Sequence, residues 1–278
     1  MSYKTILVQV DDSKNLEPRL AIAADIAAAE NAHMIGLART GVERFVAEVS
    51  SIAIDNAIIE PHIKALRQRA ADALKKFEAT ARQKGVTSTE QRMVDGEILG
   101  DISVQARCCD LVVLGQPDPD ESGVANPSFP EHIVMNSGVP AVIVPFVCTS
   151  TKLGDNALVA WNASVEATRA VHYAVPALRR AKSVKVAVFN PASLSALVDD
   201  PPGSYLERFL ARHNINAEIR TATTDGNVGD ALLALAGTLA SDYLVMGCYG
   251  HSRFREVLLG GATANVIAST PIPVLMAH

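Results

Sequence analysis

Short apolar runs alternate with helix-like segments along the whole chain. Continuous runs such as 6–10 and 184–189 predict strands that are buried on both faces. Segments between such runs, for example 63–83 and 204–213, predict helices. Strands that alternate with helices in this way predict an α/β protein with a parallel sheet wound on both faces.

The pattern occurs twice. The segment Asp110–Gly115 (DLVVLG) returns as Asp242–Gly247 (DYLVMG), 132 residues later. The first strand ends near Asp11, and its counterpart ends near Asn162, 151 residues later. The first repeat therefore holds about 20 extra residues, which we expect to form a helical excursion at roughly 41–65.

Two tandem domains follow from the repeat. We expect a first half at residues 1–147 and a second half at 156–278, each with five parallel strands. The polar, turn-rich segment 147–156 (VCTSTKLGDN) is the expected linker.

Composition narrows the function classes. Of 278 residues, 49% are hydrophobic, and the formal net charge is -5, which argues against a nucleic-acid partner. No apolar run approaches the length of a membrane span, and no signal-peptide pattern is present, so we expect a cytoplasmic protein. The cysteines are then reduced thiols, with Cys108 and Cys109 as packing residues.

A glycine-rich loop follows the fourth strand of the second half. Gly247 and Gly250 are separated by two residues, and Gly260 follows after nine more. Glycines at the end of a strand let backbone N–H groups approach a phosphate, and the helix that opens at 260–263 points its amides at the same place. Asn162 lies at the same sheet edge and can bond a ribose or a base. Close helix packing explains the glycines equally well, and the loop alone does not separate the two interpretations.

These features resemble the universal stress protein family in its tandem form. The resemblance covers nearly the whole chain. It rests on the segments that follow the first strand of each half, 10–13 (VDDS) and 161–164 (WNAS), on the Asp-Gly-x-x-Gly-Asp segment at 225–230, and on the glycine spacing, which matches the family's ATP-binding pattern. It implies a stress-response or signalling protein of adenine-nucleotide α-hydrolase-like fold that binds ATP, AMP or ADP, with Mg²⁺ accompanying ATP. It also implies pairing of the two domains within one chain and leaves a homodimer open.

The resemblance places a nucleotide site in the second half. Two of its positions depart from the family pattern. Asn162 replaces an aspartate that holds the ribose hydroxyls, and Gly261 replaces a serine or threonine next to the phosphates. We expect both changes to weaken ATP binding, with Thr263 compensating for the lost hydroxyl. The implied site residues are Ala160, Asn162, Met246, Gly247, Gly250, Gly260, Gly261, Ala262 and Thr263.

The first half departs much further from a nucleotide site. It keeps Asp11 and Gly115, but no glycine follows three residues later. Pro117 and Pro119 remove backbone donors, and the acidic residues of segment 118–121 would repel a triphosphate. We therefore expect the first half to be structural.

Three functions stay open: nucleotide-dependent signalling, a scaffold that binds no nucleotide and acts through domain pairing and partner contacts, and a slow ATPase. No catalytic set and no metal-ligand spacing can be placed in the sequence. His251, Arg253 and Arg255 are candidate phosphate contacts but equally suit an exposed loop. Cys248 is a candidate redox thiol, although an unreactive loop cysteine is the simpler interpretation.

Overall fold

The computed structural model of the chain describes residues 2–50, 56–96, 98–117, 129–191, 201, 203–250 and 261–278. For residues 56 and 98–101 the description covers the backbone alone. Gly260 and residues 118–121, 251, 253 and 255, all singled out above, lie outside the described residues.

The first half alternates strands and helices as expected. Its elements are β1 (Thr5–Val10), α1 (Leu16–Glu30), β2 (His33–Arg39), α2 (Val42–Val49), α3 (Asn56–Gln83), β3 (Thr89–Val94), α4 (Ile98–Ala106), β4 (Leu111–Gly115), α5 (Phe129–Ser137) and β5 (Ala141–Val144).

The second half repeats this order. Its elements are β6 (Asn156–Ala160), α6 (Val165–Arg180), β7 (Ser183–Phe189), α8 (Ser204–Arg212), β8 (Ala217–Ala222), α9 (Val228–Thr238), β9 (Tyr243–Gly247), α11 (Ala262–Ser269) and β10 (Val274–Ala277). Residues 145–155 connect the halves without helix or strand.

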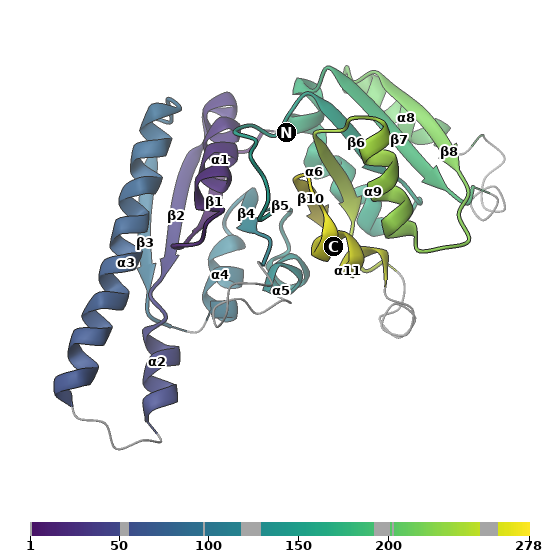
Figure 1. The fold of residues 1–278 in the computed structure, drawn as a ribbon. Helices are drawn as coiled ribbons and strands as arrows, with labels where there is room; N and C mark the ends of the chain where they lie inside the picture. Colours follow the sequence, from purple (N-terminus) through teal and green to yellow (C-terminus); the bar gives the residue numbers. More distant parts are fainter. Residues whose placement is uncertain are drawn as a thin grey trace.

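All ten strands join one sheet in the order β3-β2-β1-β4-β5-β10-β9-β6-β7-β8. Within each half every pairing is parallel, which confirms the doubly wound five-stranded arrangement. The two parallel sets meet where β5 pairs with β10 in the antiparallel sense, with Val142 opposite Leu275. Figure 1 shows these two strands at the centre, between the halves.

The repeat extends to the side-chain contacts. Oδ2 of Asp110 accepts hydrogen bonds from the backbone N–H groups of Lys4 and Thr5, at 2.7 and 2.9 Å. Oδ2 of Asp242 accepts the same pair of bonds from Asp155 and the first residue of β6, both at 2.8 Å. Each aspartate thus ties the loop before the fourth strand of its half to the start of the first strand.

The extra residues of the first half form helices, as predicted. They supply α2 and the beginning of α3, which starts at Asn56, seven residues before the expected start at 63. Because α3 has 28 residues, it runs well beyond the sheet, and α2 lies beside its protruding end (Figure 1).

The core lies in two layers, one on each face of the sheet. Helices α1, α3, α6 and α8 bury residues such as Leu20, Phe77 and Val171 against one face. Helices α4, α5, α9 and α11 bury residues such as Ile133 and Val266 against the other. Burial on both faces explains why the strands read as continuous apolar runs rather than alternating ones.

Polar contacts accompany the β5–β10 pairing between the halves. Gln116, buried after β4, donates from Nε2 to the carbonyl of Ile267 at 2.7 Å and accepts from the N–H of Phe146 at 3.1 Å. Arg180 of α6 pairs with Asp25 of α1 at 2.9 Å.

The outer strands β3 and β8 carry matching ion pairs. Arg92 bonds Glu90 at 2.6 Å on β3, and Arg220 bonds Glu218 at 2.5 Å on β8. All four residues lie on the outermost strands of the described sheet, where charged side chains discourage pairing with another chain.

The four cysteines are free thiols. Cys109, Cys148 and Cys248 are buried. The expectation that Cys108 packs in the interior is wrong, because it follows the end of α4 at the surface. Among the described helices, none is both long enough and apolar enough to cross a bilayer.

Replacing Gln116 tests the contact between the halves. We expect Gln116→Ala to lower the free energy of unfolding by about 1–3 kcal/mol, because one buried and one half-buried backbone group lose their side-chain partner. Urea unfolding measures the change. The control is Gln68→Ala on the exposed surface of α3, for which we expect a change within about 0.5 kcal/mol. Equal losses in the two variants would contradict this role of Gln116.

Candidate functional site

Each half has a point where the strand order reverses, between β1 and β4 in the first half and between β6 and β9 in the second. In open parallel sheets, ligands bind beyond the carboxyl ends of the strands at such points. Asp11 and Gly115 lie there in the first half, and Asn162 and Gly247 lie there in the second. The two points can be compared residue by residue.

In the second half, the end of β6 leads directly into a capped helix. Ala160 is half-buried, and Asn162 is exposed with Oδ1 accepting from the N–H of Ser164 at 3.1 Å. Ser164 caps α6 by accepting from the N–H of Ala167 at 3.1 Å. The oxygen of the Asn162 side-chain amide is therefore bonded within the turn after β6, and the NH₂ group lies on an exposed side chain at the sheet edge.

Gly247 is required by the packing of α6. A Cβ at this position would lie 2.4 Å from the backbone nitrogen of Ala167, too close for any other residue without a backbone shift. The neighbouring Met246 is buried in β9. Of the two interpretations of the glycines, phosphate binding and close helix packing, close helix packing is sufficient to explain Gly247.

Gly250 faces a side chain instead of backbone. A Cβ there would lie 2.5 Å from Oε2 of Glu166, which is in the first turn of α6. The glutamate carboxylate thus stands beside the loop on which the sequence pattern places phosphates. The sequence pattern gives no signal for Glu166, because an acidic residue in the first turn of a helix is common.

The start of α11 is tied to the loop. Thr263 is buried, and its Oγ1 accepts from the N–H of Tyr249 at 3.2 Å. Gly261 is the N-cap, and Ala262 is the first helical residue. The Thr263 hydroxyl is therefore already engaged as an acceptor and has one proton left to donate.

Gly229 brings a further helix to this place. A Cβ at Gly229 would lie 2.8 Å from the carbonyl oxygen of Ala262, so α9 and α11 approach closely at their starts. Oδ1 of Asn265 lies beside Gly229 and is buried without a hydrogen-bond partner among the described residues. The Asp-Gly-x-x-Gly-Asp segment thus owes its second glycine to helix packing.

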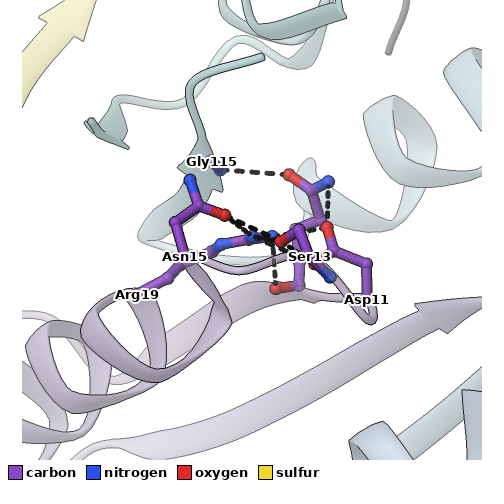
Figure 2. A network of polar contacts seen from close by, with 6 residues as sticks. Asp11, Ser13, Asn15, Arg19 and Gly115 are labelled. Carbon is purple, nitrogen blue, oxygen red and sulfur yellow. Dashed lines mark hydrogen bonds and ion pairs between the residues drawn. The ribbon is translucent and has the colours of Figure 1, made fainter. Parts of the chain in front are cut away.

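In the first half, the corresponding place is filled by an ion pair. Arg19 is 1% exposed, and its Nη1 lies 2.7 Å from Oδ2 of Asp11. Figure 2 shows the guanidinium surrounded by acceptors: it also donates to Ser13 Oγ at 2.7 Å and to Asn15 Oδ1 at 2.8 Å. The Asp11 carboxylate, at the position that would hold a ribose, is therefore paired with an arginine of the helix that follows it, α1.

This network fixes the charge of Asp11. Burial alone would raise its pKa, but the charge and hydrogen bonds of Arg19 and the hydrogen bonds from Ser13 hold the pKa below the ordinary value of 3.8. Asp11 is therefore ionised at neutral pH.

Arg19 also closes the approach to Gly115. A Cβ at Gly115 would lie 2.9 Å from the guanidinium carbon of Arg19, so this glycine accommodates an arginine. With the offset of 151 residues, the counterpart of Arg19 in α6 is Ala170. The match between the two repeats did not predict this difference between Arg19 and Ala170. The signal that could have shown it is the single arginine in the alanine-rich helix α1.

A second arginine fills the space near α5. The guanidinium carbon of Arg39 lies 5.0 Å from the ring centroid of Phe129. Phe129 begins α5 as Ala262 begins α11, so a large aromatic ring stands where the second half has a methyl group. Burial lowers the pKa of Arg39 to about 10, while the nearby Asp11 opposes that shift.

Comparison with known sequences now gives the family. The sequence profile of the universal stress protein family matches the chain twice, over residues 2–145 and 155–278. The chain belongs to the universal stress protein family. It is a tandem member with two domains of that family.

Three proteins show how this universal stress protein compares with its relatives. A universal stress protein of Synechocystis sp. is 35% identical over 69 residues, a segment that makes up 25% of this chain and 23% of that protein. A universal stress protein of Archaeoglobus fulgidus has a TM-score of 0.72 at 18% identity, covering 98% of this chain and 95% of that one. A Pseudomonas aeruginosa protein of unknown function has a TM-score of 0.61 at 17% identity, covering 99% and 92%. Both structures establish the fold.

Neutralising Asp11 tests the buried ion pair of this universal stress protein. We expect Asp11→Asn to lower the free energy of unfolding by about 2–4 kcal/mol at pH 7, because Arg19 would keep a buried charge without a counterion. Since the folded-state pKa of Asp11 lies below its ordinary value, the wild-type advantage persists above that value and shrinks as the pH falls through the folded-state pKa.

Denaturant unfolding from pH 7 to acid pH measures this gap. The exposed Asp72 gives the control, and Asp72→Asn should change stability by less than about 0.5 kcal/mol. A gap between wild type and Asp11→Asn that widens in acid would contradict the assignment.

Proposed function

We propose that the second half, residues 156–278, binds an adenine nucleotide, ATP or its relatives AMP and ADP, and that the first half, residues 1–147, is structural. Nucleotide binding would then control a stress-response or signalling activity through conformation or partner choice. We place the protein in the cytoplasm, where its free cysteines suit a reducing compartment.

The contrast between the two switch points carries this proposal. In the first half, Arg19 occupies Asp11 and lies against Gly115. In the second half, Ala170 replaces the arginine and Asn162 is exposed at the edge. One edge is thus filled by the protein's own cation, while its counterpart keeps an exposed side chain that can bond a ligand.

The residues of the second half suit different parts of a nucleotide. Asn162 would bond the ribose hydroxyls, beside Ala160 and Met246. The backbone N–H groups at Gly250 and at the start of α11 would meet the phosphates, since N-terminal helix amides favour anions. Among the described residues, no cluster of His, Cys, Asp or Glu could hold a metal ion, so Mg²⁺ would arrive with the phosphates of ATP.

Other universal stress proteins have been solved in complex with cAMP and with dAMP. Each aligns with about half of this chain at a TM-score of 0.35.

Nucleotide stoichiometry tests the proposal. We expect calorimetric titration of the full chain with ATP and Mg²⁺ to give one site per chain, and Gly250→Asp to abolish binding by placing a carboxylate in the phosphate loop. The variant should fold, because the described atoms nearest to an added Cβ at Gly250 belong to the movable Glu166 and Ser164 side chains, and the backbone there has no positive φ.

Gly237→Asp is the matched control, since Gly237 lies in α9 with open space around it. It should bind ATP as the wild type does. No binding of ATP, ADP or AMP at millimolar concentration by folded wild-type protein would overturn the proposal. Two sites per chain would show that the first half is not merely structural.

Glu166 gives a second test. We expect Glu166→Gln to raise ATP affinity about threefold to tenfold, because it removes a negative charge beside the phosphate loop. The affinity for adenosine, which has no phosphates, should not change. Glu207→Gln, in the first turn of α8, is the control and should leave both affinities unchanged. A loss of ATP affinity in Glu166→Gln would contradict the repulsion.

A scaffold without nucleotide is the second candidate. Its support is that helix packing already explains Gly247 and Gly229. In that case the surfaces left free by the β5–β10 pairing would bind partners, a second copy of the chain among them. Recovery of a nucleotide from the purified protein by mass spectrometry would exclude this candidate.

A further inference from the structure

The first half contains a pocket of about 620 Å³ that its structural role does not use. It lies between the helices α2 and α3 and the carboxyl ends of β1, β2 and β3. Its volume is in the range of sites that enclose small organic molecules. The helix α2 and the start of α3 belong to the extra residues of this half, and no counterpart of this wall occurs among the described residues of the second half.

Arg39 is a cation of the pocket with a donor that is unbonded among the described residues. Arg39 lines the pocket, and Nη1 of its guanidinium is buried without a hydrogen-bond partner among the described residues. The Arg39 guanidinium lies against the Phe129 ring, which offers no acceptor oxygen for its N–H groups. The neighbouring Asp11 is already bonded by Arg19. The Arg39 side chain as a whole is half-buried and lines the pocket, so its accessible part presents a positive charge that suits a carboxylate ligand.

The helices α2 and α3 also bring apolar side chains to the pocket. Phe45 from α2 and Leu66 from α3 line it, and the Phe45 ring lies 4.1 Å from the His62 ring, centroid to centroid. Ala47 and Ala70 add small side chains that leave room. These walls suit an aromatic or aliphatic body attached to the anionic group.

The other charges disfavour phosphates. The acidic lining residues are largely paired already: Glu48 with Arg44, Asp12 with Arg69, and Asp95 with Arg67. Carboxylates nevertheless outnumber arginines, so a group with two negative charges meets more repulsion than one with a single charge. The described acidic and basic lining residues are Asp11, Asp12, Glu43, Glu48 and Asp95 against Arg39, Arg44 and Arg69.

We propose that this pocket binds a small monocarboxylate with an apolar body, its carboxylate on Arg39 and its body between Phe45 and Leu66. The site is separate from the nucleotide site of the second half and would give the first half a ligand of its own. The ligand would join α2 and α3 to the strand ends, and so would order the protruding helices.

Calorimetric titration of the full chain with defined probes tests the proposal. Phenylacetate and octanoate represent aromatic and aliphatic monocarboxylates, phenylacetamide is the neutral counterpart, and phenyl phosphate is the dianion. We expect at least one acid to bind with millimolar or better affinity, and about tenfold more tightly than the amide or the phosphate.

Arg39→Met removes the charge and keeps the length of the side chain. We expect it to weaken acid binding about tenfold, whereas Arg212→Met, at an exposed arginine of α8, should bind as the wild type does. Ala47→Trp narrows the pocket from α2 and leaves Arg39 unchanged. We expect it to weaken acid binding as well, and it provides the test if Arg39→Met fails to fold. Acid binding should persist in Gly250→Asp, which separates this result from the fate of the nucleotide site.

Three results would overturn the proposal. The first is that folded wild-type protein binds neither acid at about 10 mM. The second is that the amide or the phosphate binds as tightly as the acid. The third is that folded Arg39→Met and Ala47→Trp keep the wild-type affinity.

Discussion

The antiparallel pairing of β5 with β10 is the contact on which the rest of this molecule depends. Each half brings a parallel sheet with one inner edge, and an unpaired inner edge would expose backbone donors and acceptors to water or to another chain. Joining the two edges turns ten strands into one sheet and lets the core layers on both faces continue across the junction. Gln116 reinforces the junction by bonding across it to α11.

Because the pairing is made within one chain, the halves have no need to be alike. A symmetric homodimer would duplicate every substitution in both copies, whereas here Arg19 stands in one half and Ala170 in the other. The arginine stabilises its own half through the Asp11 network and also fills the ligand edge there. At the first switch point, Arg19 thus contacts both Asp11 and Gly115, the two residues that face a ligand edge in the repeat pattern.

Much of the fold could be predicted from the pattern of the sequence. The offsets between matching strands located the extra helices of the first half, since an insertion changes the spacing without changing the flanking motifs. The start of α3 was placed seven residues late, because its first two turns protrude from the sheet and carry no regular apolar stripe. The sequence could not show why residue 247 is glycine, because a bound phosphate and the nearby backbone nitrogen of Ala167 would each exclude a side chain there.

The pairing of Arg19 with Asp11 was also beyond the pattern. A lone arginine in a helix is usually solvated, and only the three-dimensional path of α1 shows that this one lies under Asp11 and Gly115. The pocket beside Arg39 could not be foreseen either, because its walls come from strands and helices that are separated by many residues. What the sequence did carry was the asymmetry between the halves, visible in the proline and acidic residues after Gly115.

The glutamate–arginine pairs on β3 and β8 have a consequence for behaviour at high concentration. A continuous ten-stranded sheet is long, and its two rims are the places where further molecules could add strands and grow a fibre. The pairs Glu90–Arg92 and Glu218–Arg220 cover both rims with side chains that would lose water on stacking. Each half thus places one charged pair on its own outer strand, which disfavours the joining of sheets end to end.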